Sequence, residues 1–178
     1  SARLSEEKEK FSKYKINVFI DNKELKSPPV VIEKSPSFYN LFGKKERSVE
    51  LGLLKTDFTK IQAGSLHRAN GGFLLLEASA VLKLPYIWDT LKRALRSQQG
   101  FIEDLEDQAS VIPTSGITPK PIDLNVKVLL MGSDEVYRLL FDLDQDFSKV
   151  FKIKAEFQSS VQRNKSNVQA YQSFVNTR

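Results

Sequence analysis

The chain contains no cysteine, one histidine and one methionine among its 178 residues. Disulfides and thiolate metal ligands are therefore excluded, and a single histidine argues against a structural zinc site, so we expect no bound metal in this chain. No apolar run approaches the roughly 18 residues that a membrane-spanning helix needs. The first residues are charged and lack a signal-peptide pattern. The sequence thus favours a cytoplasmic protein with no membrane partner.

A strong excess of one charge is also missing. Lysine and arginine number 27 against 22 acidic residues, which gives a formal net charge of +5, and the two signs are interspersed. The segment from Arg163 to Arg178 has three basic residues and no acid, which is too few positive charges to indicate a nucleic-acid contact. DNA therefore stays an alternative partner, which salt-sensitive binding would reveal.

No phosphate-binding loop of the pattern G-x-x-x-x-G-K-[ST] occurs anywhere in the chain. Such a loop needs consecutive backbone N–H groups at a helix N-terminus and a lysine for the terminal phosphates. The segment LFGKKER holds one glycine, and Gly71-Gly72 precedes an apolar run typical of a strand. We therefore expect this chain by itself to bind ATP weakly.

The most informative stretch runs from Gly64 to Glu77. It predicts a short polar helix, a Gly-Gly break and an apolar strand that ends on a carboxylate. Four bulky apolar residues in a row are typical of a strand buried on both faces of a parallel sheet. Ligand sites collect at the carboxyl ends of such strands, which puts Glu77 at the edge of a candidate crevice.

Other patterns complete an α/β prediction. Pro85 is suited to the first turn of a helix that reaches Ser97 and is stopped by Gly100, and Trp88 on this helix should be at least partly buried. We also expect strands, hairpins and helices over the following ranges: a charged helix 4–14, strands 16–20 and 30–32 (the second buried), a loop or hairpin 41–60, a helix 79–84, a hairpin 101–121, a buried strand 126–131, a helix containing Tyr137, Leu140 and Phe141, a strand 151–157, and a helix from a Ser166 cap to Val175.

The same residues resemble a known family. GSLHRANGGFLLLEA resembles the segment around the Walker B strand in the AAA+ modules of Lon-type ATP-dependent proteases, in particular the LonB-like branch. PPVVIEKSPSFYNLFG resembles the strand and turn before it, and PYIWDTLKRALRSQQGFIED the helix and hairpin after it. PIDLNVKVLLMGSDEVYRLL resembles the sensor-1 strand with its helix, and DFSKVFKIKAEF the closing strand. The resemblance covers roughly residues 14 to 178.

The resemblance implies a partial AAA+, P-loop NTPase-like core that has a parallel sheet with flanking helices and lacks the phosphate-loop strand. Residues 1–14 would end a helical insertion, 15–158 would form the partial core, and 159–178 would start the helical lid. The parent would be a cytoplasmic, ATP-dependent, Lon-like serine endopeptidase that assembles as a ring hexamer and uses ATP and Mg²⁺. The Ser-Lys protease dyad of that family lies in a separate domain that nothing here resembles, so we expect this chain alone to be inactive.

The resemblance also assigns candidate site residues, each with a structural alternative. Glu77 matches the Walker B aspartate that holds Mg²⁺ through water, or it is a solvated strand end. Ser133 matches sensor 1, or it caps a helix. Lys149 stands near the usual arginine-finger position. Ala78 replaces the glutamate that often orients the attacking water, which supports a second interpretation: a non-hydrolysing scaffold with a degenerate ATP site.

Residues 42 to 58 correspond to a pore loop in related hexamers. Phe42, Leu51, Leu53 and Leu54 would grip protein substrates there, with hairpin packing as the alternative. His67 and Arg68 invite a catalytic role, but the lone histidine favours a helix residue with a structural hydrogen bond.

Overall fold

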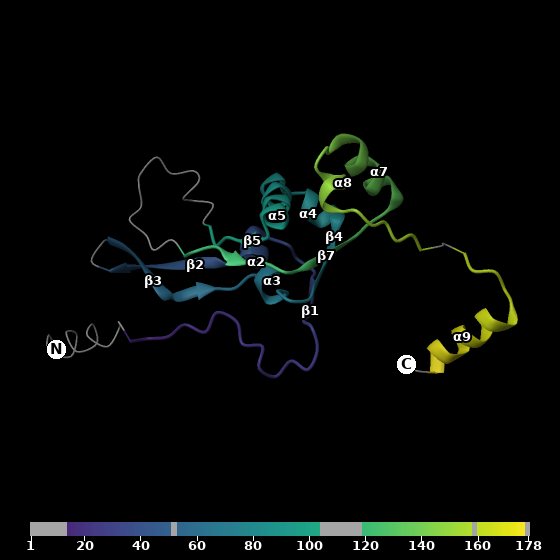
Figure 1. The fold of residues 1–178 in the computed structure, drawn as a ribbon, viewed down its shortest axis with the longest axis horizontal. Coiled ribbons are helices and arrows are strands. Elements are labelled where there is room, and N and C mark those ends of the chain that lie inside the picture. Colours follow the sequence, from purple (N-terminus) through teal and green to yellow (C-terminus); the bar gives the residue numbers. More distant parts are fainter. Residues whose placement is uncertain (1–13, 51–52, 104–118, 158–159, 177–178) are drawn as a thin grey trace.

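The computed structural model describes residues 14–50, 53–103, 119–157 and 160–176. Its centre is a parallel sheet of three strands in the order β1-β4-β7, formed by Val30–Glu33, Phe73–Glu77 and Lys127–Met131 (Figure 1). β4 is the middle strand, with Leu74 in register with Val31 and with Val128. The predicted α/β class with a parallel sheet and flanking helices is confirmed.

One face of this sheet joins the core and the other does not. Leu74 and Leu76 of β4 are fully buried. Residues in register share a face, so Ile32, Leu75 and Leu129 lie on the opposite side, where Ile32 is 57% and Leu129 44% exposed. The prediction that β4 is buried on both faces is therefore wrong, as are the buried strands predicted at 30–32 and 126–131, because side chains on that second face stay exposed to solvent.

The buried face packs against a helical layer. The helices are α2 (Phe38–Phe42), α3 (Ser65–Arg68), α4 (Ala78–Leu82), α5 (Pro85–Ser97), α7 (Asp134–Leu143) and α8 (Phe147–Val150). α5 has the predicted bounds, with Pro85 in its first turn, and ends at Gln98, whose φ of 53° is left-handed. Gly100 was predicted to stop this helix, but it lies in the next strand.

Two antiparallel hairpins, one long and one short, accompany the parallel sheet. β2 (Lys44–Glu50) pairs antiparallel with β3 (Leu53–Gln62), which confirms the hairpin predicted within 41–60. β5 (Gln99–Gly100) pairs antiparallel with β6 (Ile122–Asp123). Most of the hairpin predicted at 101–121 lies outside the described residues.

The ends of the chain depart most from the sequence-based expectations. Residues 16–20 and 151–157 form no strand, and Ile153 and Phe157 are 90% and 93% exposed, because no neighbouring strand pairs with them. α9 (Lys165–Asn176) has no buried residue and lies at the opposite end of the long axis from the β2–β3 hairpin (Figure 1). Its first turn is capped by Asn164, whose side-chain oxygen accepts the N–H of Asn167 at 2.8 Å, and not by Ser166 as predicted.

The charged helix predicted at 4–14 falls almost wholly outside the described residues. Within the part that the structure describes, no helix is long and apolar enough to cross a membrane.

Candidate functional site

The carboxyl edge of the parallel sheet brings two predicted site residues to neighbouring strands. Glu77 is the last residue of β4 and is in register with Met131, the last residue of β7. Ser133 follows β7 after one glycine. Because both strands run in the same direction, Glu77 and Ser133 lie at the same edge, where ligand sites form in sheets of this kind.

Glu77 is exposed, and its carboxylate accepts a hydrogen bond from the Ser79 hydroxyl. The residue after it, Ala78, starts α4 and is 4% exposed. A buried methyl group cannot orient a water molecule. The structure thus leaves Glu77 as the acidic side chain at this strand end.

Ser133 caps α7. Its hydroxyl oxygen accepts the backbone N–H of Val136 at 3.4 Å, so the capping role given as its alternative is present. Lys149 lies on α8, and its ammonium is 3.0 Å from a carboxylate oxygen of Asp146. Lys149 thus pairs with Asp146, not with Glu77 or Ser133.

The described residues do not by themselves fit a nucleotide. A nucleotide site needs a cradle of backbone N–H groups for the phosphates, and the sequence has no phosphate loop. At the ends of β4 and β7 the structure offers one carboxylate and one capping hydroxyl. No group of three or more metal-ligating side chains occurs among the described residues.

A second carboxylate at this edge was not anticipated. Glu33 ends β1, and its carboxylate accepts the Ser65 hydroxyl at 2.5 Å and the backbone N–H of Ser35 at 2.9 Å. Arg68 donates to Ser65 at 2.9 Å and lies 3.9 Å from Glu33. These contacts bind the start of α3 to the end of β1. The signal was available in the sequence, since Glu33 ends an apolar run as Glu77 does.

The predicted burial of Trp88 is confirmed, since the side chain is 7% exposed. Its indole N–H donates to Asp144 at 2.6 Å, and Lys92 donates to the same carboxylate at 2.7 Å. Burial works against the charged form of Asp144, but the hydrogen bonds from Lys92 and Trp88 outweigh it and lower the pKa of this carboxyl. The cluster joins α5 to the end of α7.

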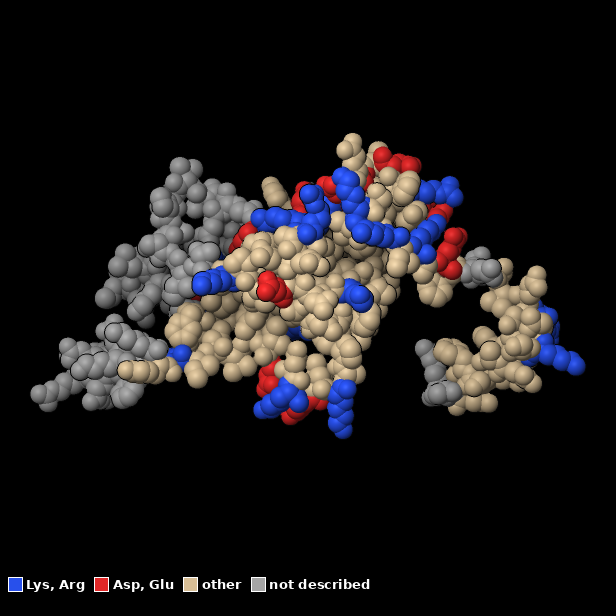
Figure 2. Space-filling model, in the orientation of Figure 1, with Lys and Arg blue, Asp and Glu red and all other residues tan. Residues whose placement is uncertain are grey.

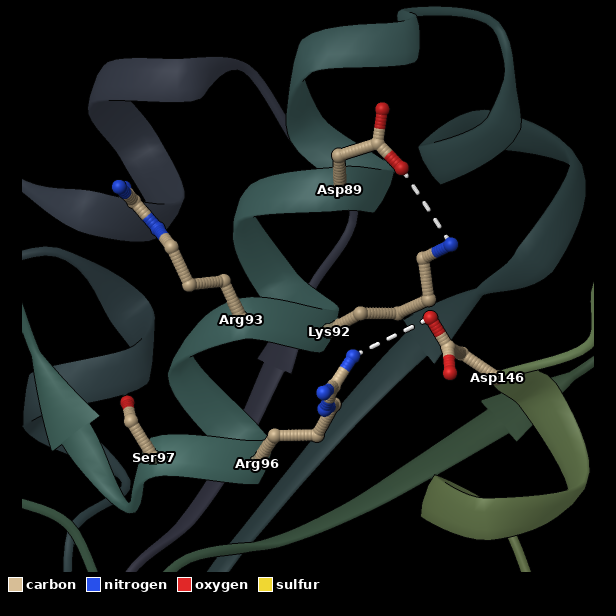
Figure 3. A pocket seen from close by; sticks show the side chains of 6 residues that line it. All are labelled: Asp89, Lys92, Arg93, Arg96, Ser97 and Asp146. Atoms are coloured by element: carbon tan, nitrogen blue, oxygen red, sulfur yellow. Dashed lines mark hydrogen bonds and ion pairs between the residues drawn. The ribbon is translucent and has the colours of Figure 1, made fainter.

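An open pocket beside α5 gathers charged side chains of both signs (Figure 3). Each cation has an acidic partner: Lys92 pairs with Asp89 and Asp144, Arg93 with Glu103, and Arg96 with Asp146. On the visible face of the molecule, basic and acidic groups are likewise mixed around α5, α7 and α8 (Figure 2). This pairing reduces the positive potential that a nucleic-acid backbone would meet.

The predicted substrate-gripping residues do not form one group. Phe42 is 1% exposed and lies 5.0 Å, between ring centroids, from Phe38 in the core. The prediction that Phe42 contacts substrate is therefore wrong, because its α2 position buries the ring. Leu53 and Leu54 begin β3, where their backbones pair with Glu50 and Val49. Leu51 lies outside the described residues.

The comparison with protein families decides the classification. A model described as LonB-like, AAA domain, matches residues 26–158, which is most of the chain. The chain belongs to the LonB-like AAA domain family. The resemblance inferred from the Walker B-like and sensor-1-like segments is thereby confirmed, and this family is one of AAA modules.

No curated protein matches the chain. Among solved structures, NtrX from Brucella abortus aligns with 16% identity and a TM-score of 0.44. The alignment covers 70% of this chain and 25% of that one, so the chain spans about a quarter of the length of that protein.

Proposed function

We propose that this LonB-like AAA domain is part of the ATPase module of a Lon-like ATP-dependent serine protease, and that it couples nucleotide state to the movement of polypeptide substrates. The observation that supports this best is the adjacent placement of Glu77 and Ser133 at the carboxyl edge of the sheet within the family match. The parent is a cytoplasmic ring hexamer in this proposal, in which copies of the chain are each other's partners.

In the parent, ATP with Mg²⁺ would supply the transferable phosphoryl group, and the phosphate loop would have to come from outside this chain. Glu77 would be the carboxylate available to hold the cation, and Ser133 would offer a hydroxyl at the neighbouring strand end. Lys149, which pairs with Asp146 in this structure, would add positive charge from α8. The chain has no protease dyad and handles substrate only.

The β2–β3 hairpin is the part that contacts substrate in this proposal. It extends from the body of the domain (Figure 1), and Leu53 and Leu54 are the first two residues of β3, paired with Glu50 and Val49 of β2. Apolar side chains on an exposed segment can hold an extended peptide without sequence preference. The sheet edge is connected to α3 by the contacts among Glu33, Ser65 and Arg68. Because α3 follows the hairpin closely in the chain, a shift of the sheet edge would move the hairpin through α3.

The nucleotide role is tested with Glu77→Gln in the full-length protein, with Glu135→Gln as the matched control. Glu135 is an exposed glutamate in the first turn of α7. We expect Glu77→Gln to lower ATP turnover about tenfold or more, which corresponds to about 1.4 kcal/mol of barrier, and to lower degradation of a protein substrate with it. Turnover equal in both variants and the wild type would refute the role of Glu77.

The hairpin is tested with Leu53→Ser combined with Leu54→Ser in the full-length protein. The control pair is Leu139→Ser with Leu143→Ser on α7, two leucines that are 54% and 76% exposed. We expect only the hairpin pair to lose protein degradation while the circular dichroism spectrum is kept. If degradation and nucleotide turnover both stay at wild-type levels, the hairpin does not contact substrate; a collapsed fold would identify the leucines as core residues.

A scaffold without hydrolysis is the second candidate, because Ala78 stands buried where a water-orienting glutamate would be expected. In that case the full-length protein assembles without measurable ATP turnover, and Glu77→Gln changes neither. Sedimentation and a phosphate-release assay on one preparation separate the two functions.

A further inference from the structure

The single histidine of the chain is buried without a hydrogen-bond partner. His67 lies in the middle of α3 and is 0% exposed. Neither of its ring nitrogens, Nδ1 or Nε2, has a partner within the described structure. The sequence-based expectation of a structural hydrogen bond is therefore wrong. A buried polar group without a partner destabilises the folded state, so its place needs an explanation.

The ring is enclosed by segments that are distant in sequence. The Phe19 ring meets it edge-on, with centroids 5.3 Å apart and planes at 73°. A methyl group built on Gly100 would lie 2.6 Å from Nε2 and 3.3 Å from the Leu124 side chain. His67 thus fills the space that α3 shares with the segment around Phe19, with β5 and with the residues after β6.

These segments also reach the β2–β3 hairpin. The side-chain amide of Asn17 donates to the carbonyls of Phe58 and Ile61 in β3, at 3.0 and 2.9 Å. α3 itself begins three residues after β3 ends. The packing around one imidazole ring therefore joins both hairpins of the domain to α3.

Among the described residues, no charged side chain compensates a proton on this ring. Burial is the cause that lowers the pKa of His67, to about 4, and no charged side chain contributes to the shift. The helix α2, which packs beside α3, carries no charged residue. The other elements around the ring do carry charged side chains. These are Arg68 on α3, Glu33 on β1, Lys15 and Asp21 in the segment that contains Phe19, and Asp123 on β6.

We propose that His67 is an acid-sensitive lock, which holds the Phe19 segment, β5 and β6 on α3 while its ring is neutral and releases them when the ring is protonated. The lock responds to proton binding and not to nucleotide binding, and so goes beyond the proposed function. We expect the opening to be local, and Trp88, whose ring packs on Phe147 and Phe151, reports on the rest of the core.

The pH at which the lock opens follows from the pKa of the ring in its closed and open forms. In the closed form the pKa is about 4, whereas a solvated imidazole has its ordinary value of 6.5. Well above pH 6.5 the ring is neutral in both forms, and the closed form is favoured. As the pH falls from 6.5 to 4, the open form binds the proton more tightly and its share rises, by at most about 300-fold.

One histidine and one tryptophan allow the local and global events to be separated. The Cε1 proton of His67 is followed by NMR between pH 7.5 and 4, together with amide exchange at Phe19, Gly100 and Leu124, and with Trp88 fluorescence. We expect a titration midpoint well below 6.5 and faster exchange of these amides at pH 5, corrected for intrinsic rates, with unchanged fluorescence. A midpoint near 6.5, or exchange that accelerates only when Trp88 fluorescence also changes, would overturn the lock.

Two variants test the mechanism. Gly100→Ala places a methyl group against Nε2, so we expect it to displace the ring and move the His67 midpoint toward 6.5. Gly132→Ala is the matched control, since its methyl group would meet Ala78 and not the histidine, and it should leave the midpoint unchanged. His67→Leu should abolish the acid-dependent exchange. Acid-dependent exchange that persists in His67→Leu would assign the opening to other groups and reject the lock.

Discussion

Truncation of Trp88 provides a direct test of the helical core. Its side chain is 7% exposed, stacks on Phe151 with ring centroids 5.9 Å apart, and lies 6.3 Å from Phe147. Lys92 stands 5.4 Å from the ring centroid. Because a buried tryptophan loses both its transfer free energy and its packing when it is truncated, we expect Trp88→Ala to cost about 3–5 kcal/mol. That is a large share of the roughly 5–15 kcal/mol that stabilises a domain.

Trp88→Phe separates packing from the hydrogen bond. Phenylalanine keeps most of the apolar contact but removes the indole N–H that donates to Asp144. Asp144 still accepts from Lys92 at 2.7 Å and from the backbone of Asp146 at 2.9 Å, so its charge stays partnered. We therefore expect a smaller cost, about 1.5–3 kcal/mol, typical of a hydrogen bond to a charged group.

The assay is urea denaturation followed by far-ultraviolet circular dichroism, since fluorescence would lose its only tryptophan. With a slope of about 2 kcal/mol per molar urea, a 4 kcal/mol loss lowers the midpoint by about 2 M. Tyr86→Ala on the same helix is the control, because that side chain is 67% exposed and should change little. A midpoint shift below about 0.5 M for Trp88→Ala would refute the assigned burial, and equal losses for the alanine and phenylalanine variants would assign the energy to the hydrogen bond.

Three further outcomes are expected. The 178-residue chain should bind ATP with Mg²⁺ weakly for want of a phosphate loop, and a calorimetric dissociation constant tighter than about 10 µM would contradict this. The purified chain should not cleave casein, and activity that follows the protein through every purification step would show a protease site that the sequence does not reveal. The free energy of unfolding should decrease as the pH is lowered. His67 contributes to this loss between pH 6.5 and about 4, and the carboxyls of Asp144 and Asp146, whose pKa values are lowered, contribute to it at pH values below the ordinary carboxyl range. Stability that rises as the solution is acidified would contradict that sign.

Much of the local structure was predictable because its signals are local. Pro85 at the first turn and apolar residues at helical spacing determined the bounds of α5. The apolar runs at residues 73–77 and 127–131 produced strands because they are short, bulky and bounded by turn residues. The family resemblance rested on the order and spacing of such segments, which folding does not alter.

The site was predictable only in part. That Glu77 and Ser133 stand at neighbouring strand ends follows from a parallel sheet, which the apolar runs already indicated. The contacts of Glu33 with Ser65 and Arg68, and of Trp88 with Asp144, join residues 32 to 56 positions apart, and nothing in a linear pattern specifies such pairs.

What the sequence by itself determined is the α/β class, the strand and helix periods, the family and the lack of a phosphate loop, because each depends on residues close together in the chain. Only the tertiary structure decided burial. It placed Phe42 in the core, left one face of the sheet exposed, gave residues 151–157 no strand partner, and enclosed His67 without a hydrogen bond. Burial depends on which distant segments arrive on each face, and that is a property of the packed chain.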